Sequence, residues 1–128
     1  MKDKSYSESE MKYCKQMADV MFQQIFWSID KFTFFSWGVS RLTYMYCQEM
    51  PTLALKVSGL LHNGWIFVSL DESNDTYIVT LKDLDFSVVN TVENVYCDNL
   101  GAVIDGLVEK KPELTKEEYK ILIMENYN

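Results

Sequence analysis

Five short β-prone segments follow one another through the middle of the chain, and they constrain its fold more than any other feature. They are rich in β-branched, leucine and aromatic residues, and only a few turn-forming residues separate each from the next. Links this short join antiparallel neighbours, because a parallel connection takes about a dozen residues or more. We therefore expect a four- to five-stranded antiparallel β-meander. The segments span residues 41–47, 52–61, 65–70, 76–82 and 86–90.

Helical patterns flank this meander. Ser7 and Glu10 have the spacing of a capping box, and apolar residues then recur with a helical period to about residue 31. The second half of this pattern, "FQQIFWSIDKF", is apolar on more than one face, so it is either covered on several sides or joins an interface. An apolar stripe predicts another helix over 96–109, and Thr115 opens a last one.

The fold class that follows is α+β. It has a long N-terminal helix, then the meander, then two C-terminal helices packed on one sheet face, because strands with one apolar face need a cover. A length of 128 residues predicts one domain over 1–128, with 1–7 as a flexible tail. The segment "TFFSWGVS" at 33–40 fits either a first strand or a helix-to-sheet corner, where Gly38 permits an unusual turn.

The dipeptide Asn63-Gly64 predicts a tight hairpin, because a type I′ turn requires positive φ at both central residues. With these two residues as the loop, His62 lies opposite Trp65. The same register pairs Val57 with Leu70 and places Leu61 on the core side. His62, the only histidine, is then expected at an exposed tip, stacked on Trp65.

Charge is distributed unevenly along the chain, whose net charge is −7. Residues 1–70 hold 7 basic and 6 acidic side chains, whereas residues 71–128 hold 5 and 13. This balance disfavours nucleic acid, which needs a basic surface. It permits a basic protein partner, although an acidic surface also serves solubility alone.

Several features predict a cytoplasmic protein without membrane contact. The polar first residues, "MKDKSYSESEMKYCKQ", lack the apolar core of a signal peptide. No apolar run reaches the roughly 18–20 residues that span a bilayer. The three cysteines are widely spaced and odd in number, which fits reduced thiols better than disulfides.

Motifs of known chemistry are missing from the sequence. There is no phosphate-binding glycine loop, nucleophile elbow or zincin motif, and three cysteines with one histidine lack the spacing of a zinc site. His62 is the only histidine that could activate a cysteine. The acidic run "DESND" lacks the spacing of a calcium loop. We therefore expect no catalytic, cofactor-binding or metal-binding residue and no cofactor.

Three stretches together resemble small uncharacterised proteins of Bacteroides-type gut bacteria and their mobile elements. They are "SWG", "LKVSGLLHNGWIFVSLDESNDTYIVTL" and "VYCDNLGAVIDGLVE", and the resemblance covers about residues 27–109. It implies a cytoplasmic accessory role in a bacterium and carries over no functional residue.

The leading hypothesis is a non-enzymatic, acidic protein-interaction or inhibitor module. The alternative is a small-molecule-binding protein or enzyme with an aromatic pocket between the sheet and the first helix, near Trp27, Trp37 and Tyr44. A homo-oligomeric subunit is a third hypothesis. The candidate interaction residues are His62, Trp65, Phe67, Trp37, Tyr44, Asp71, Glu72 and Asp75.

Overall fold

The computed structural model describes residues 5–109 and confirms the α+β class. A long N-terminal helix precedes a five-stranded antiparallel meander, and a C-terminal helix packs against that first helix and the sheet. The second C-terminal helix, expected from Thr115, lies outside the described residues. The elements are α1 (Glu8–Ser28), α2 (Lys31–Ser36), β1 (Arg41–Cys47), β2 (Met50–Ser58), β3 (Asn63–Asp71), β4 (Thr76–Lys82), β5 (Val88–Val95) and α3 (Leu100–Val108).

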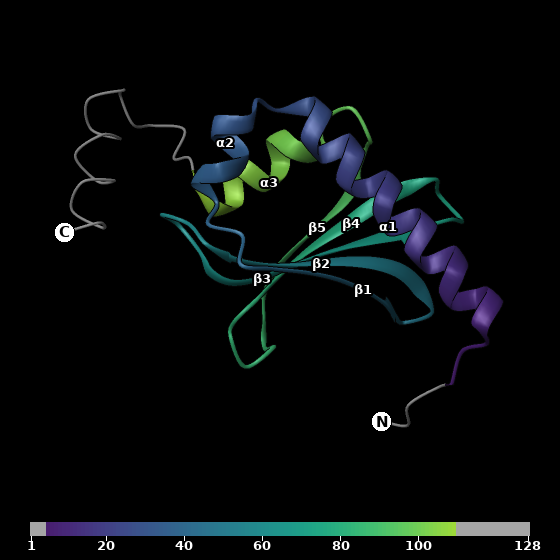
Figure 1. Cartoon of the computed structure of the whole chain (residues 1–128). Coiled ribbons are helices and arrows are strands. Elements are labelled where there is room, and N and C mark those ends of the chain that lie inside the picture. The colour runs from purple at the N-terminus through teal and green to yellow at the C-terminus, as the bar shows by residue number, and fades with distance from the viewer. Residues whose placement is uncertain (1–4, 110–128) are drawn as a thin grey trace.

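The sheet has the strand order β1-β2-β3-β4-β5, with every neighbouring pair antiparallel. Both α1 and α3 lie on one face of it (Figure 1). Within the described part of the chain, no helix covers the other face. Alternate side chains of β2, β3 and β4 point into the core on the helical side, where they meet α1 and α3. Its fully buried members include Met21, Ile25, Leu55, Ile66, Val68, Val79, Leu100 and Ile104.

The first helix begins as its sequence signature predicts. Ser7 Oγ accepts a hydrogen bond from Glu10 N at 3.1 Å, and Ser7 N donates to Glu10 Oε1 at 2.8 Å, which completes the capping box. The ring of Tyr6 stacks on Tyr46 with centroids 4.0 Å apart. Residues 6 and 7 of the expected tail therefore contact folded elements.

Residues 33–40 form the corner and not a strand. Asp30 Oδ1 accepts a hydrogen bond from Thr33 N at 2.8 Å, which starts the short helix α2. Gly38 has φ +60, a conformation that favours glycine, and it turns the chain into β1. Because α2 lies at the end of α1, the corner brings two aromatic-rich segments together (Figure 1).

The predicted β2–β3 hairpin register is wrong. Val57 pairs with Gly64 and not with Leu70, so Asn63-Gly64 belongs to β3 and the loop is Gly59–His62. Gly59 N donates to the His62 carbonyl at 2.9 Å across this loop. The displacement is six residues, an even number, so each strand keeps its expected apolar face toward the core.

The reason for the different loop lies in α3. Leu61 N donates to the Val108 carbonyl at 2.7 Å, and Leu60 N donates to Glu109 Oε1 at 2.6 Å. These bonds hold the loop against the end of α3. Leu61, expected in the core, is 36% exposed as a result.

Candidate functional site

The eight expected interaction residues do not form one site. Trp65 and Phe67 lie on the helix-free face of the sheet, and Tyr44 lies on edge strand β1. The other five lie in the core, in the β2–β3 loop and at the β3–β4 turn.

Trp37 is fully buried and joins two elements. Its indole Nε1 donates to Asp105 Oδ1 at 2.9 Å, which connects the end of α2 to α3. Its ring lies 5.4 Å from that of Phe34. Trp37 thus belongs to the core beneath α2 and is not available to a partner.

His62 is buried and not at an exposed tip, with 8% of its surface exposed. Its Nε2 lies 3.1 Å from the Lys82 carbonyl oxygen, which can only accept, so Nε2 carries the proton. The expected stacking on Trp65 is also wrong, because Trp65 stacks on Phe86 at 5.4 Å. His62 therefore fastens the β2–β3 loop to β4.

Two of the three cysteines, Cys14 and Cys47, have the character of neutral thiols. Burial raises the pKa of the Cys14 and Cys47 thiols, which favours the protonated and less nucleophilic form. Within residues 5–109, no three His, Cys, Asp or Glu side chains come close enough together to hold a metal ion.

The acidic β3–β4 turn is internally bonded and attached to α1. Asp71 accepts from Ser73 Oγ at 2.6 Å and from Asn74 Nδ2 at 3.2 Å, and the Ser73 bond lowers the pKa of the Asp71 carboxyl. Glu72 accepts a hydrogen bond from the Tyr13 hydroxyl of α1, and this bond raises the pKa of Tyr13 to about 12. Asp75 closes the turn with φ 56. The turn presents negative charge in a fixed conformation.

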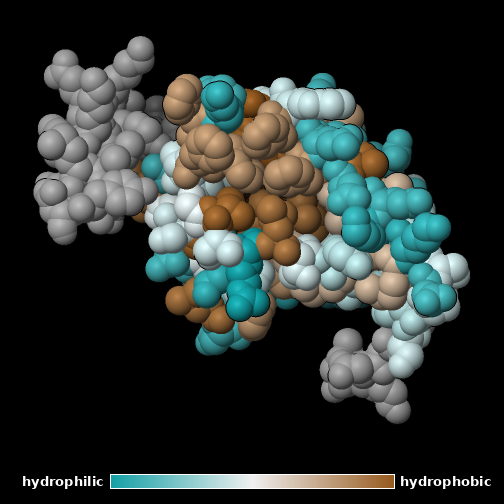
Figure 2. All heavy atoms as spheres, viewed as in Figure 1, coloured by the Kyte–Doolittle hydropathy of each residue, from teal (hydrophilic) through white to brown (hydrophobic). Residues whose placement is uncertain are grey.

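A cluster of exposed aromatic side chains lies where α1 meets α2. We call Phe26, Trp27, Phe32 and Phe35 the aromatic corner. Their exposed fractions are 38%, 80%, 75% and 64%. Figure 2 shows apolar atoms gathered over α2 and the end of α1.

Buried Phe34 supports this corner. Its ring lies 5.2 Å from Phe26 and 6.2 Å from Phe35. Rings held on a buried aromatic base lose little further freedom when they bind, which suits them to an interface. The site prediction omitted Trp27, Phe32 and Phe35 from its interaction residues, although the apolar run "FQQIFWSIDKF" signals them.

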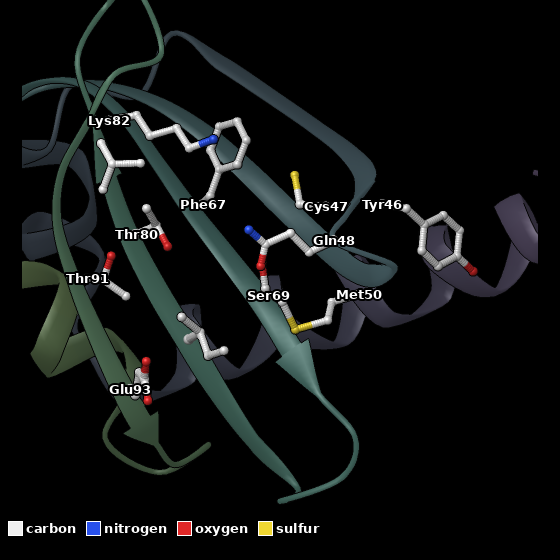
Figure 3. A pocket seen from close by; sticks show the side chains of 12 residues that line it. Tyr46, Cys47, Gln48, Met50, Phe67, Ser69, Thr80, Lys82, Thr91 and Glu93 are labelled. Atoms are coloured by element: carbon white, nitrogen blue, oxygen red, sulfur yellow. The ribbon is translucent and has the colours of Figure 1, made fainter. Parts of the chain in front are cut away.

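The helix-free face of the sheet contains a cavity of about 470 Å³. Figure 3 shows Phe67, Thr80, Lys82, Thr91 and Glu93 projecting from β3, β4 and β5 on the side away from α1 and α3. Residues of β1, β2 and the turn between them complete the lining: Tyr46, Cys47, Gln48 and Met50. Phe67, one of the expected residues, forms part of its wall.

A smaller hollow of about 190 Å³ lies between α1 and β1, lined by Phe22, Leu42 and Tyr44 among others. This is the region where the alternative hypothesis expects an aromatic pocket. Of the three aromatics in that hypothesis, Tyr44 lines the hollow, Trp37 is buried in the core and Trp27 points to solvent.

No helix within residues 5–109 has both the length and the apolar character to span a membrane. Comparison with models of protein families, with curated proteins and with solved structures found no match.

Proposed function

We propose that this protein is a non-enzymatic interaction module that docks a basic protein partner through the aromatic corner. The observation that carries the proposal is the exposure of Trp27, Phe32 and Phe35 within one short segment, where the end of α1 leads into α2. Large contiguous apolar patches are rare on monomeric surfaces and mark sites of association. Tryptophan and other aromatic side chains also dominate the energetics of protein interfaces.

Charge supports a basic partner. The chain has a net charge of −7, which attracts a basic protein and accelerates its approach. The negative β3–β4 turn is fixed by its own hydrogen bonds and by Tyr13, so it contributes a stable part of this field. A cytoplasmic accessory role in a bacterium is part of the proposal and rests on the sequence resemblance. An inhibitory form of that role rests instead on the acidic charge of the chain.

The alternative of a ligand pocket between the sheet and α1 has less support. Its hollow of about 190 Å³ is smaller than the roughly 300–1,000 Å³ of most small-molecule sites. The raised pKa values of the Cys14 and Cys47 thiols and a histidine engaged with a backbone carbonyl likewise give no support to an enzyme.

The test compares two matched triple variants of the full chain. Trp27→Ser/Phe32→Ser/Phe35→Ser removes the aromatic corner. Leu84→Ser/Val89→Ser/Tyr96→Ser removes three apolar side chains that are 53–56% exposed elsewhere. Proteins captured by the wild type from a bacterial lysate are identified, and each candidate is purified and titrated against all three forms by calorimetry.

We expect a basic protein that binds the wild type and the control variant equally and the corner variant at least tenfold more weakly. Its affinity should fall as salt rises, because the charge contribution is screened. Equal binding by the corner variant would refute the proposal. So would an acidic partner, or sedimentation showing that the corner serves only to join copies of this chain.

A further inference from the structure

The cavity on the helix-free face has one positive and one negative side chain at opposite ends. Lys82 is the last residue of β4, and Glu93 lies on β5 near the level of Ile78. Figure 3 shows these two side chains at opposite ends of the cavity, with Thr80 and Thr91 between them. Four residues of strand separate the two levels, which is about 13 Å along the sheet.

The positive end of the cavity is Lys82, which has no negatively charged partner among residues 5–109. Lys82 Nζ lies 4.2 Å from the centroid of the Phe67 ring, which positions the cation at the cavity wall. Within residues 5–109, Lys82 makes no ion pair. A ligand carboxylate placed there would meet a positioned and unneutralised charge.

The negative end of the cavity is Glu93, whose carboxylate likewise has no partner in the described part of the chain. Glu93 makes no hydrogen bond or ion pair to any residue in the range 5–109. It is too far along the sheet to neutralise Lys82 directly. A ligand that satisfies both ends therefore carries a positive group and a negative group separated by a length comparable to these two strand levels, about 13 Å along the sheet.

The floor between the two ends is polar, and one wall is apolar. Hydroxyl groups of Ser69, Thr80 and Thr91 line the floor, and Ser69 Oγ lies 2.8 Å from Thr52 Oγ1. Phe67 and Met50 supply apolar and sulfur atoms beside it. Such a surface suits a molecule with repeated hydrogen-bonding groups and small apolar side groups, rather than a plain hydrocarbon chain.

We propose that this cavity binds a short peptide with free ends, its carboxylate at Lys82 and its ammonium group at Glu93. An extended chain spans about 3.3–3.6 Å per residue, so three to four residues bridge the two charges. A peptide without net charge also avoids the repulsion that the net charge of −7 exerts on anions. The site lies on the face opposite α1 and α3, so it is independent of the aromatic corner.

The experiment uses alanine peptides of two to six residues as probes, with the full-length protein observed by amide NMR. The tetrapeptide is also tested in an N-acetylated and a C-amidated form. Each probe is titrated into the wild type, Lys82→Gln and Glu93→Gln. Lys56→Gln is the control, because Lys56 lies on the same sheet face but does not line the cavity.

We expect the strongest binding at three to four residues, with shifts at Thr80 and Thr91. Amidation should weaken binding to the wild type at least fivefold and leave binding to Lys82→Gln unchanged. N-acetylation should likewise weaken binding to the wild type at least fivefold and leave binding to Glu93→Gln unchanged. The control should bind as the wild type does.

Three results would overturn the proposal. One is an absence of cavity shifts with any free-ended peptide at millimolar concentration. Another is an amidation effect of the same size in Lys82→Gln and the wild type. The third is affinity that rises steadily with peptide length, which would indicate nonspecific association. None of these outcomes bears on the aromatic corner.

Discussion

Gly64 allows the backbones of β3 and β4 and the ring of His62 to approach more closely than a side chain would permit. A Cβ at this position would lie 2.3 Å from the Lys82 carbonyl oxygen and 3.0 Å from His62 Nε2. The same oxygen accepts the hydrogen bond from His62. One missing methyl group thus protects the bond that fastens the β2–β3 loop.

We expect Gly64→Ala to lower the free energy of unfolding by about 1–3 kcal/mol, as overpacking does, because the nearest obstacle is backbone. Gly106→Ala is the matched control. It has nothing within 4 Å of its added Cβ and lies inside α3, so it should stabilise by up to about 1 kcal/mol. Urea unfolding at constant pH measures both. If Gly64→Ala left the free energy of unfolding unchanged, β3 and β4 would not approach each other as closely as described.

Tyr13 gives a second test at the scale of one residue. Its hydrogen bond to Glu72 raises its pKa from 10.0 to about 12. A raised pKa in the folded state stabilises the protein fully below pH 10, and that contribution disappears as pH rises through 12. We expect Tyr13→Phe to cost less than about 1 kcal/mol at pH 8, since the bond is exposed.

The difference between the wild type and Tyr13→Phe should shrink between pH 10 and 12 in urea unfolding monitored by circular dichroism. Tyr96→Phe serves as the control, because the Tyr96 hydroxyl has no hydrogen bond within residues 5–109. A constant difference across this pH range would argue against the Tyr13–Glu72 bond.

At the scale of elements, the end of α3 determines the conformation of the β2–β3 loop. Glu109 is 2% exposed, and its carboxylate accepts the hydrogen bond from Leu60 N. Glu109→Ala should lower the free energy of unfolding by about 1–3 kcal/mol, because it leaves a partly buried N–H without this acceptor. Amide exchange at Leu60 should accelerate at least tenfold.

Glu109→Gln keeps an acceptor oxygen at the same place. The amide exchange rate of Leu60 in this variant should therefore stay within about threefold of the wild-type rate. Hydrogen exchange followed by NMR distinguishes the two variants. If both variants accelerated exchange equally, the loss of charge and not of the hydrogen bond would be the cause.

The β2–β3 hairpin was predictable from the sequence in part: its faces were, and its loop was not. The apolar faces of β2 and β3 were predictable, because side chains alternate and an even displacement of six residues preserves the faces. The loop itself was not predictable from local pattern. Asn63-Gly64 is the usual signal of a tight turn, yet the hydrogen bonds that the loop backbone donates to Val108 and Glu109 select a loop three residues earlier.

The aromatic corner and the cavity also differ in how far the sequence could predict them. The aromatic corner follows from local sequence, since a helix end that is apolar on several faces must be covered or exposed. The cavity depends instead on the pairing of β4 with β5, which places Lys82 and Glu93 on one face. Its register includes shifts beside Tyr77 and Lys82 that sequence periodicity does not reveal.

At the scale of the whole molecule, the two sides of the sheet have different chemistry. The helical side carries the aromatic corner, and the other side carries the polar cavity. Both surfaces belong to a chain whose net charge is −7. Under our proposal, a basic protein docks on the helical side while the opposite side stays open.

The central claim is that the aromatic corner contacts a basic protein, and site-specific photocrosslinking in a bacterial cell tests it most directly. A photoreactive phenylalanine analogue replaces Phe35 in the corner or Tyr96 outside it, two side chains that are 64% and 56% exposed. Mass spectrometry then identifies the adducts. We predict a basic protein crosslinked from position 35 and not from position 96. Adducts only between copies of this chain, or the same adducts from both positions, would contradict the account.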